Sequence, residues 1–222
     1  MRGFPASGGG LRGVLTGVCI ALLAAGCTYN SSGPVEQHFQ DFATRPPQKN
    51  RITVCSAYGC KAQTDFRFTA ADITHLQKLM RPGKAPPTPA QERKLISDTL
   101  AWMEKRVGDV VGTSADRPGD NLAGGGDPTQ MDCVDVATNL TSYMLVLQTN
   151  GLIKSHTVGP IVIKEDLTRG FDGWPHYAAV LVEHGTRQRF AVDGWKLASG
   201  IAPEIVEVER WYIPDATVSM RN

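Results

Sequence analysis

The sequence HYAAVLVE, from His176 to Glu183, is followed by the turn HGTR and then by QRFAVD, which ends at Asp193. The two apolar, β-branched segments flank a glycine-containing turn. This pattern predicts an antiparallel β-hairpin.

Loop length fixes the register of this hairpin. If Gly185 and Thr186 are the central turn residues, or if the loop spans 184–187, Ala178 lies opposite Asp193. His176 is then diagonal to Asp193 on the same face of the sheet, within reach of an imidazole–carboxylate hydrogen bond. Trp195 lies opposite His176 and is expected to cover it.

Three helices are expected before the hairpin, each opened by a capping residue: Thr69, Thr88 and Asp132. The third helix is predicted to end at Asn150-Gly151. Strands are expected near 157–164, 176–183, 187–193 and 205–212. Helices first and an antiparallel sheet afterwards predict one α+β domain.

Composition and charge exclude several classes of protein. The chain has 222 residues, of which 41% are hydrophobic and 20% charged, so it is long enough for one globular domain. A formal net charge of +1 gives no reason to expect nucleic-acid binding. The chain has one long apolar stretch, at its start, which excludes a protein with several membrane spans.

That start resembles a bacterial lipoprotein signal. Arg2 and Arg12 precede a short apolar run, and the sequence LLAAGC ends at Cys27. We therefore expect residues 1–26 to be a signal peptide and Cys27 to carry a lipid that is the chain's link to the membrane. The alternative is ordinary cleavage that leaves Cys27 as a free thiol. Thr28, where Asp would favour retention in the inner membrane, makes the outer membrane, facing the periplasm, the expected location.

The polar, proline-rich residues 27–50 are expected to form a flexible tether to a domain spanning 51–222. In an oxidising envelope, Cys55 and Cys60 are expected to form a disulfide. Two thiols with no second Cys or His pair do not predict a metal site.

Cys133 remains outside that disulfide, and its position predicts reactivity. It follows Asp132, the expected cap of the third helix, and the partial positive charge of a helix N-terminus lowers the pKa of a thiol. A thiolate with an imidazole nearby is an effective nucleophile. The alternative is a buried structural thiol.

Cys133, His176 and Asp193, in that order, resemble the transglutaminase-like branch of the papain-type cysteine enzymes. The resemblance covers residues 127–195 and is carried by MDCVDVA (131–137), LQTNGLI (147–153), WPHYAAV (174–180) and FAVDGW (190–195). It is greatest to exported bacterial transglutaminase-like cysteine peptidases, although Met131 stands where many relatives have Gly. It implies a nucleophile helix packed on an antiparallel sheet, with Cys133 as nucleophile, His176 as general base and Asp193 as its orienting partner.

The chemistry implied is acyl transfer on amide bonds of a protein or peptide in the cell envelope, through a thioester and without a cofactor. The residues do not decide whether water or an amine accepts the acyl group. The backbone N–H of Cys133 and the side chain of Gln130 are candidate oxyanion donors. Calcium binding by the Asp-rich loop 116–127 is conceivable, although this loop has no EF-hand spacing.

Two other functions remain open. NlpC-type cell-wall peptidases also place Cys after Asp at a helix start, but they usually continue Asp-Cys-Ser-Gly, whereas this chain has Val134 and Asp135. A non-enzymatic outer-membrane lipoprotein could use the same fold for binding or structure. Labelling of the thiol distinguishes this last alternative from the enzymes.

Overall fold

The computed structural model describes residues 1, 3, 33–119, 124–164 and 175–213 of the chain. The expected signal peptide (1–26) and Cys27 lie outside these residues, apart from Met1 and Gly3. The helices and strands, in chain order, are α1 (Val35–Asp41), β1 (Arg51–Ser56), β2 (Ala62–Arg67), α2 (Ala70–Met80), α3 (Pro89–Val111), the 3₁₀ turn η1 (Thr113–Ala115), α4 (Cys133–Thr149), β3 (His156–Lys164), β4 (His176–Glu183), β5 (Arg189–Asp193), β6 (Glu204–Glu207) and α5 (Val208–Trp211).

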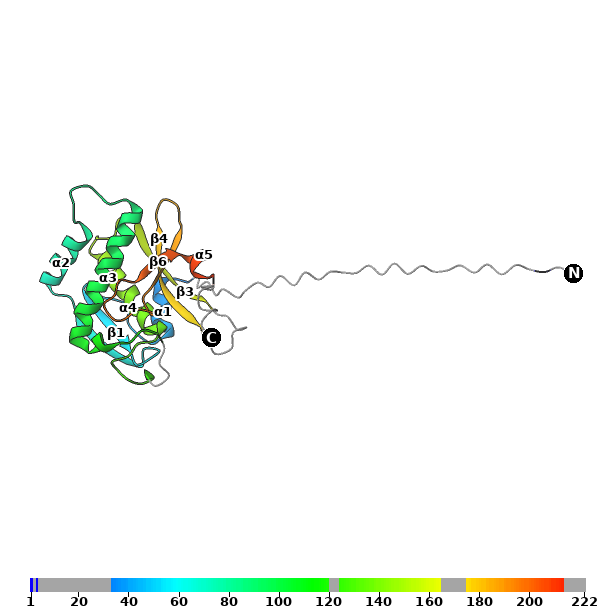
Figure 1. The fold of residues 1–222 in the computed structure, drawn as a ribbon, viewed down its shortest axis with the longest axis horizontal. Coiled ribbons are helices and arrows are strands. Elements are labelled where there is room, and N and C mark those ends of the chain that lie inside the picture. The colour runs from blue at the N-terminus through cyan, green and yellow to red at the C-terminus, as the bar shows by residue number, and fades with distance from the viewer. Residues whose placement is uncertain (2, 4–32, 120–123, 165–174, 214–222) are drawn as a thin grey trace.

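The strands among the described residues form two antiparallel sheets, which confirms the α+β class. One sheet has the order β3-β4-β5-β6, and the other is the hairpin β1-β2. Helix α4 packs against β3, β4 and β5 and also contacts β1 and α3. Figure 1 shows α2 and α3 on the side of α4 away from the four-stranded sheet. The central helix therefore has neighbours on both sides.

Helix α4 is almost wholly buried because its apolar residues do not lie on one face only. Leu140, Met144 and Leu147 are at most 2% exposed and join a core that includes Leu100 of α3 and Leu181 of β4. A helix that is apolar around most of its surface is stable only when it is enclosed. The first turn of this enclosed helix carries Cys133.

The three expected capping residues all cap helices. Thr69, Thr88 and Asp132 each accept a hydrogen bond from the backbone N–H three residues later, and each is paired reciprocally in a capping box. Such caps satisfy N–H groups that have no partner inside the helix. They fix the starts of α2, α3 and α4 at the predicted residues.

The register of the β4–β5 hairpin is the predicted one. Ala179 lies opposite Val192, and Leu181 lies opposite Phe190. The N–H of Glu183 donates to the carbonyl of Gln188 at 2.9 Å, which closes a four-residue loop over 184–187. This register places His176 and Asp193 as predicted.

The predicted tether is wrong in its second half. Residues 35–41 form helix α1, in which Phe39 is fully buried and His38 is 9% exposed. The ring of His38 shares a hydrogen bond of 2.6 Å with the hydroxyl of Thr138 on α4, and burial lowers the pKa of His38 to about 4. Burial of these two side chains draws the segment onto the domain, which therefore begins before Arg51.

The last predicted strand is also partly wrong. Only 204–207 pairs with β5, and the chain then turns into the short helix α5, which ends at Trp211.

Within the described part of the chain, no helix has the length and apolar character needed to span a membrane.

Candidate active site

Cys133 is the first residue of α4, and its position is fixed by the residues on either side. The N–H of Asp135 donates to the Asp132 carboxylate at 2.9 Å, and the N–H of Asp132 donates back to Asp135 at 3.3 Å. The N–H groups of a first helical turn have no acceptor within the helix, and the helix dipole favours negative charge there. The helix dipole favours a thiolate at Cys133, whereas the negative charge of Asp132 at the same helix start opposes one.

The thiol of Cys133 lies against the start of strand β4. Its Sγ donates to the carbonyl oxygen of Pro175 at 3.5 Å, and Pro175 immediately precedes His176. Cys133 and His176 are each only 6% exposed. The fold thus brings together the helix start and the strand start that the sequence singled out.

His176 is hydrogen-bonded to Asp193, as the register predicted. Nε2 of the imidazole lies 2.6 Å from Oδ2 of the carboxylate. Because an ionised carboxylate only accepts, Nε2 carries the proton of this bond, and the lone pair of the neutral ring is on Nδ1. Nδ1 is buried and has no hydrogen-bond partner among the described residues. The ring therefore keeps a nitrogen that can take a proton.

Asp193 is held by three donors. Besides His176, the indole N–H of Trp211 donates to Oδ2 at 2.8 Å, and the backbone N–H of Trp195 donates to Oδ1 at 3.2 Å. Burial alone would raise the pKa of Asp193, but the hydrogen bonds from His176, Trp211 and Trp195 outweigh it and hold this pKa below its usual range. Asp193 is thus an anion at neutral pH, which is the charge an orienting partner of histidine needs.

Two tryptophan rings lie beside the imidazole. The ring centroids of His176 and Trp195 are 4.7 Å apart, and those of His176 and Trp211 are 5.4 Å apart. The cover by Trp195 was expected from the register. Trp211 was missed, because the sequence around it predicted a strand and nothing in that pattern places its side chain next to Asp193.

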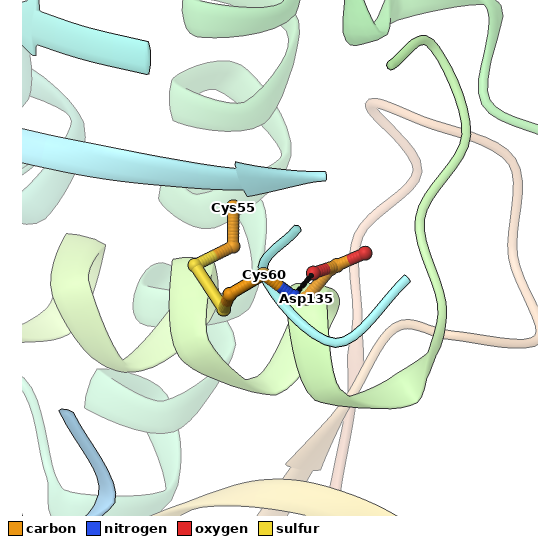
Figure 2. Close-up of side chains that lie close together, drawn as sticks. All are labelled: Cys55, Cys60 and Asp135. Carbon is orange, nitrogen blue, oxygen red and sulfur yellow. Dashed lines mark hydrogen bonds between the residues drawn. A yellow bond between two sulfur atoms is a disulfide. The ribbon is translucent and has the colours of Figure 1, made fainter. Parts of the chain in front are cut away.

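The first turn of α4 is also fixed by the predicted disulfide. Figure 2 shows Cys55, at the end of β1, joined to Cys60, whose N–H donates to the carboxylate of Asp135 at 2.6 Å. The N–H of Tyr58 donates to the same carboxylate at 2.8 Å. Burial, and next the charge of Asp132, raise the pKa of Asp135, whereas these N–H groups oppose the rise.

The turn within the disulfide has an unusual backbone. Ala57, Tyr58, Gly59 and Cys60 all have positive φ, between 58° and 68°. Residues with a side chain avoid this region, at a cost of about 1–2 kcal/mol each. The left-handed turn directs two N–H groups at Asp135, and it is held against the helix that carries Cys133.

Among the described residues, Cys55, Cys60 and Asp135 form a close group of side chains of metal-ligating types. The sulfurs of Cys55 and Cys60 and a carboxylate oxygen of Asp135 lie within 4.8 Å of one another. Metal binding requires thiolates, and here the two sulfurs are bonded to each other. The oxidised site therefore offers no thiolate ligands.

The side chain of Gln130 has a structural role in this conformation. Its amide nitrogen donates to the carbonyl of Ala115 at 3.1 Å and to that of Thr129 at 3.3 Å, and its oxygen accepts from Arg117. Both amide protons thus have acceptors within the protein. Of the two candidate oxyanion donors, this geometry favours the backbone N–H of Cys133.

Comparisons of the chain with protein-family models, curated proteins and solved structures find no match. The roles proposed for Cys133, His176 and Asp193 therefore rest on chemistry and geometry alone.

Proposed function

We propose that the chain is a cysteine peptidase-like enzyme of the bacterial cell envelope, with a papain-like, transglutaminase-like arrangement of helix and sheet, that performs acyl transfer on amide bonds. The observation that carries the proposal is the hydrogen bond of 2.6 Å between His176 and Asp193, next to the helix start that bears Cys133. A thiol, an imidazole and a carboxylate in this order form a catalytic triad.

In the proposed reaction, Nδ1 of His176 holds the proton of Cys133, and the thiolate attacks the carbonyl carbon of an amide. The backbone N–H of Cys133 stabilises the oxyanion that forms. When the C–N bond breaks, His176 gives its proton to the leaving amine, and the acyl group remains on Cys133 as a thioester. Water or a second amine then gives its proton to His176 and releases the acyl group.

The substrate of the proposed enzyme is a protein or peptide of the envelope. We propose that residues 1–26 are removed as a signal peptide and that a lipid on Cys27 anchors the chain to the outer membrane. Metabolic labelling with a radioactive fatty acid tests this step. Label in the wild type and not in Cys27→Ser is the expected result.

The test of the triad is the rate at which iodoacetamide alkylates Cys133 as a function of pH. In the wild type we expect fast labelling below about pH 6.5, where an ordinary thiol with a pKa of about 8.5 is almost unreactive. His176→Ala should abolish this reactivity at acidic pH. His184→Ala is the matched control, because His184 lies exposed in the loop of the same hairpin.

One observation favours the non-enzymatic alternative. Cys133 and His176 are both 6% exposed, so a substrate reaches the thiol only if the surroundings move. If Cys133 shows ordinary thiol behaviour that is the same in His176→Ala, the triad is wrong. The domain is then better described as a tethered binding or structural module.

A further inference from the structure

One oxygen of Asp193 accepts two hydrogen bonds, and one of the donors lies outside the proposed triad. Oδ2 accepts from Nε2 of His176 at 2.6 Å and from the indole N–H of Trp211 at 2.8 Å. Trp211 ends helix α5 and is 7% exposed. A buried donor at this distance fixes the direction of a carboxylate as well as its charge.

The indole itself is held in place by Lys164 on strand β3. The ammonium group of Lys164 lies 4.4 Å from the centroid of the Trp211 ring and donates to the Trp211 carbonyl at 3.0 Å. In the sheet, Lys164 is directly opposite His176. Trp211 also packs in the small core cluster with Val208 and Val180. The donor to Asp193 is therefore part of a fixed arrangement.

We infer that Trp211 is a positioning residue of the proposed triad, acting through Asp193 to aim Oδ2 at Nε2 of His176. The inference rests on the proposed function. Without the indole N–H, the carboxylate is held by two donors instead of three, so it turns more easily about its side-chain bond. The hydrogen bond from His176 to Asp193, which keeps the proton on Nε2 and the lone pair on Nδ1, then weakens.

Removing this donor has a second effect in the same direction. The buried anion of Asp193 would keep two of its three donors, so its pKa would rise. As Asp193 becomes protonated, it ceases to stabilise an imidazolium at His176. Both effects reduce the thiolate–imidazolium pair at acidic pH.

Among the other charges near the pair, Lys164 contacts Trp211, and Trp211→Phe keeps an aromatic ring and the backbone carbonyl for its ammonium group. The titratable and charged groups on the elements packed around His176 are His156 and Lys164 on β3, Tyr177 and Glu183 on β4, Arg189 and Asp193 on β5, Glu204 and Glu207 on β6, Glu209 and Arg210 on α5, and Asp132, Cys133, Asp135 and Tyr143 at or within α4. A change in pH profile on removing the indole N–H is therefore assigned to Asp193 only where it disappears in an Asp193→Ala background.

The test compares Trp211→Phe with Trp102→Phe in the full chain, purified in detergent. Trp102 is a partly buried tryptophan of α3 that stacks on His75. The readout is the ratio of Cys133 alkylation rates at pH 5.5 and pH 9, measured by mass spectrometry of the Cys133 peptide. Trp211→Phe should lower this ratio about tenfold, the effect of losing one hydrogen bond to a charged group. Trp102→Phe should leave it unchanged even if it lowers thermal stability.

A double-mutant cycle tests whether Trp211 acts through Asp193. In an Asp193→Ala background, Trp211→Phe should have no further effect on the ratio. The inference is overturned if Trp211→Phe leaves the ratio at the wild-type value, or if its effect is equally large in Asp193→Ala.

Trp211→Met is the second variant, to be used if Trp211→Phe does not fold. Failure of both variants to fold would make Trp211 a structural residue and overturn the positioning role. If Cys133 in the wild type is not alkylated at pH 5.5, the proposed triad itself is refuted. That result is distinct from a reactive wild type that is insensitive to Trp211, which refutes the inference alone.

Discussion

Replacing Glu104 with Gln is expected to stabilise the folded chain at alkaline pH. Glu104 lies partly buried on α3, and its carboxylate accepts the N–H of Gly200 at 3.1 Å. Burial, and in addition the charge of Asp116, raise the pKa of Glu104 from 4.5 to about 7, against the effect of the Gly200 N–H. The folded state thus favours the neutral carboxyl group, which Gln resembles in shape and charge.

The sign and size of the effect follow from proton linkage. Between pH 4.5 and about 7, the folded chain holds a proton at Glu104 that the unfolded chain has lost. The free energy of unfolding is therefore highest below the unfolded pKa and falls as pH rises through the folded one. For this difference between the folded and unfolded pKa, the unfolding free energy lost through Glu104 is at most about 3 kcal/mol at pH 8.

The assay is urea unfolding from pH 4.5 to 8.5 without reductant, so that the disulfide remains intact. The difference in unfolding free energy between Glu104→Gln and the wild type should grow from near zero at pH 4.5 to about 2–3 kcal/mol at pH 8. Glu207→Gln, at an exposed carboxylate, should show no such growth. A difference that stays below about 0.5 kcal/mol across this range would refute the reasoning.

Two further substitutions test how the site is supported. Replacing both Cys55 and Cys60 with Ala opens a loop with a sequence separation of 5 and should lower the unfolding free energy by about 2 kcal/mol, measured with urea; an unchanged value would contradict this. Glu92→Ala should cost about 3–5 kcal/mol. The buried Glu92 carboxylate accepts from the N–H of Lys154 and from Nδ1 of His156, and both donors would lose their acceptor. The measurement is the Tm of the variant. A Tm within 2 °C of the wild-type value, roughly the shift expected from 1 kcal/mol, would contradict this prediction.

Local rules predicted the parts of the site that depend on short-range geometry. Loop length between β4 and β5 determines which residues face each other, so the contact between His176 and Asp193 could be deduced. The cap at Asp132 determines where α4 begins and therefore the position of Cys133. Neither deduction needs a residue distant in the sequence.

Contacts between distant segments were not predictable in the same way. Val35, His38, Phe39 and Phe42 have helical spacing, but a helix of 7 residues has little stability of its own. Its formation depends on burial against the domain and on a bond from His38 to Thr138, which is 100 residues away. Because the surrounding sequence is rich in proline, the helical spacing was not recognised and the segment was predicted to be a tether.

Trp211 illustrates the same limit at the other end of the domain. The valine-containing segment 205–212 has the composition of a strand, yet its second half is the helix α5. Tertiary contacts override the weak strand propensity of such a short segment. The donor to Asp193 appears only when this turn is placed beside β5.

Docking of α1 changes how far from the proposed lipid anchor the folded domain can lie. The tether predicted from the sequence, from Cys27 to Arg51, would have 24 residues and a maximum extension of about 80 Å. Because helix α1 begins at Val35, eight residues after Cys27, the chain between them can span at most about 28 Å. If the proposed lipid anchor and activity are correct, the enzyme would work within roughly one protein diameter of the bilayer, and its substrates would have to expose their target amides close to the membrane surface.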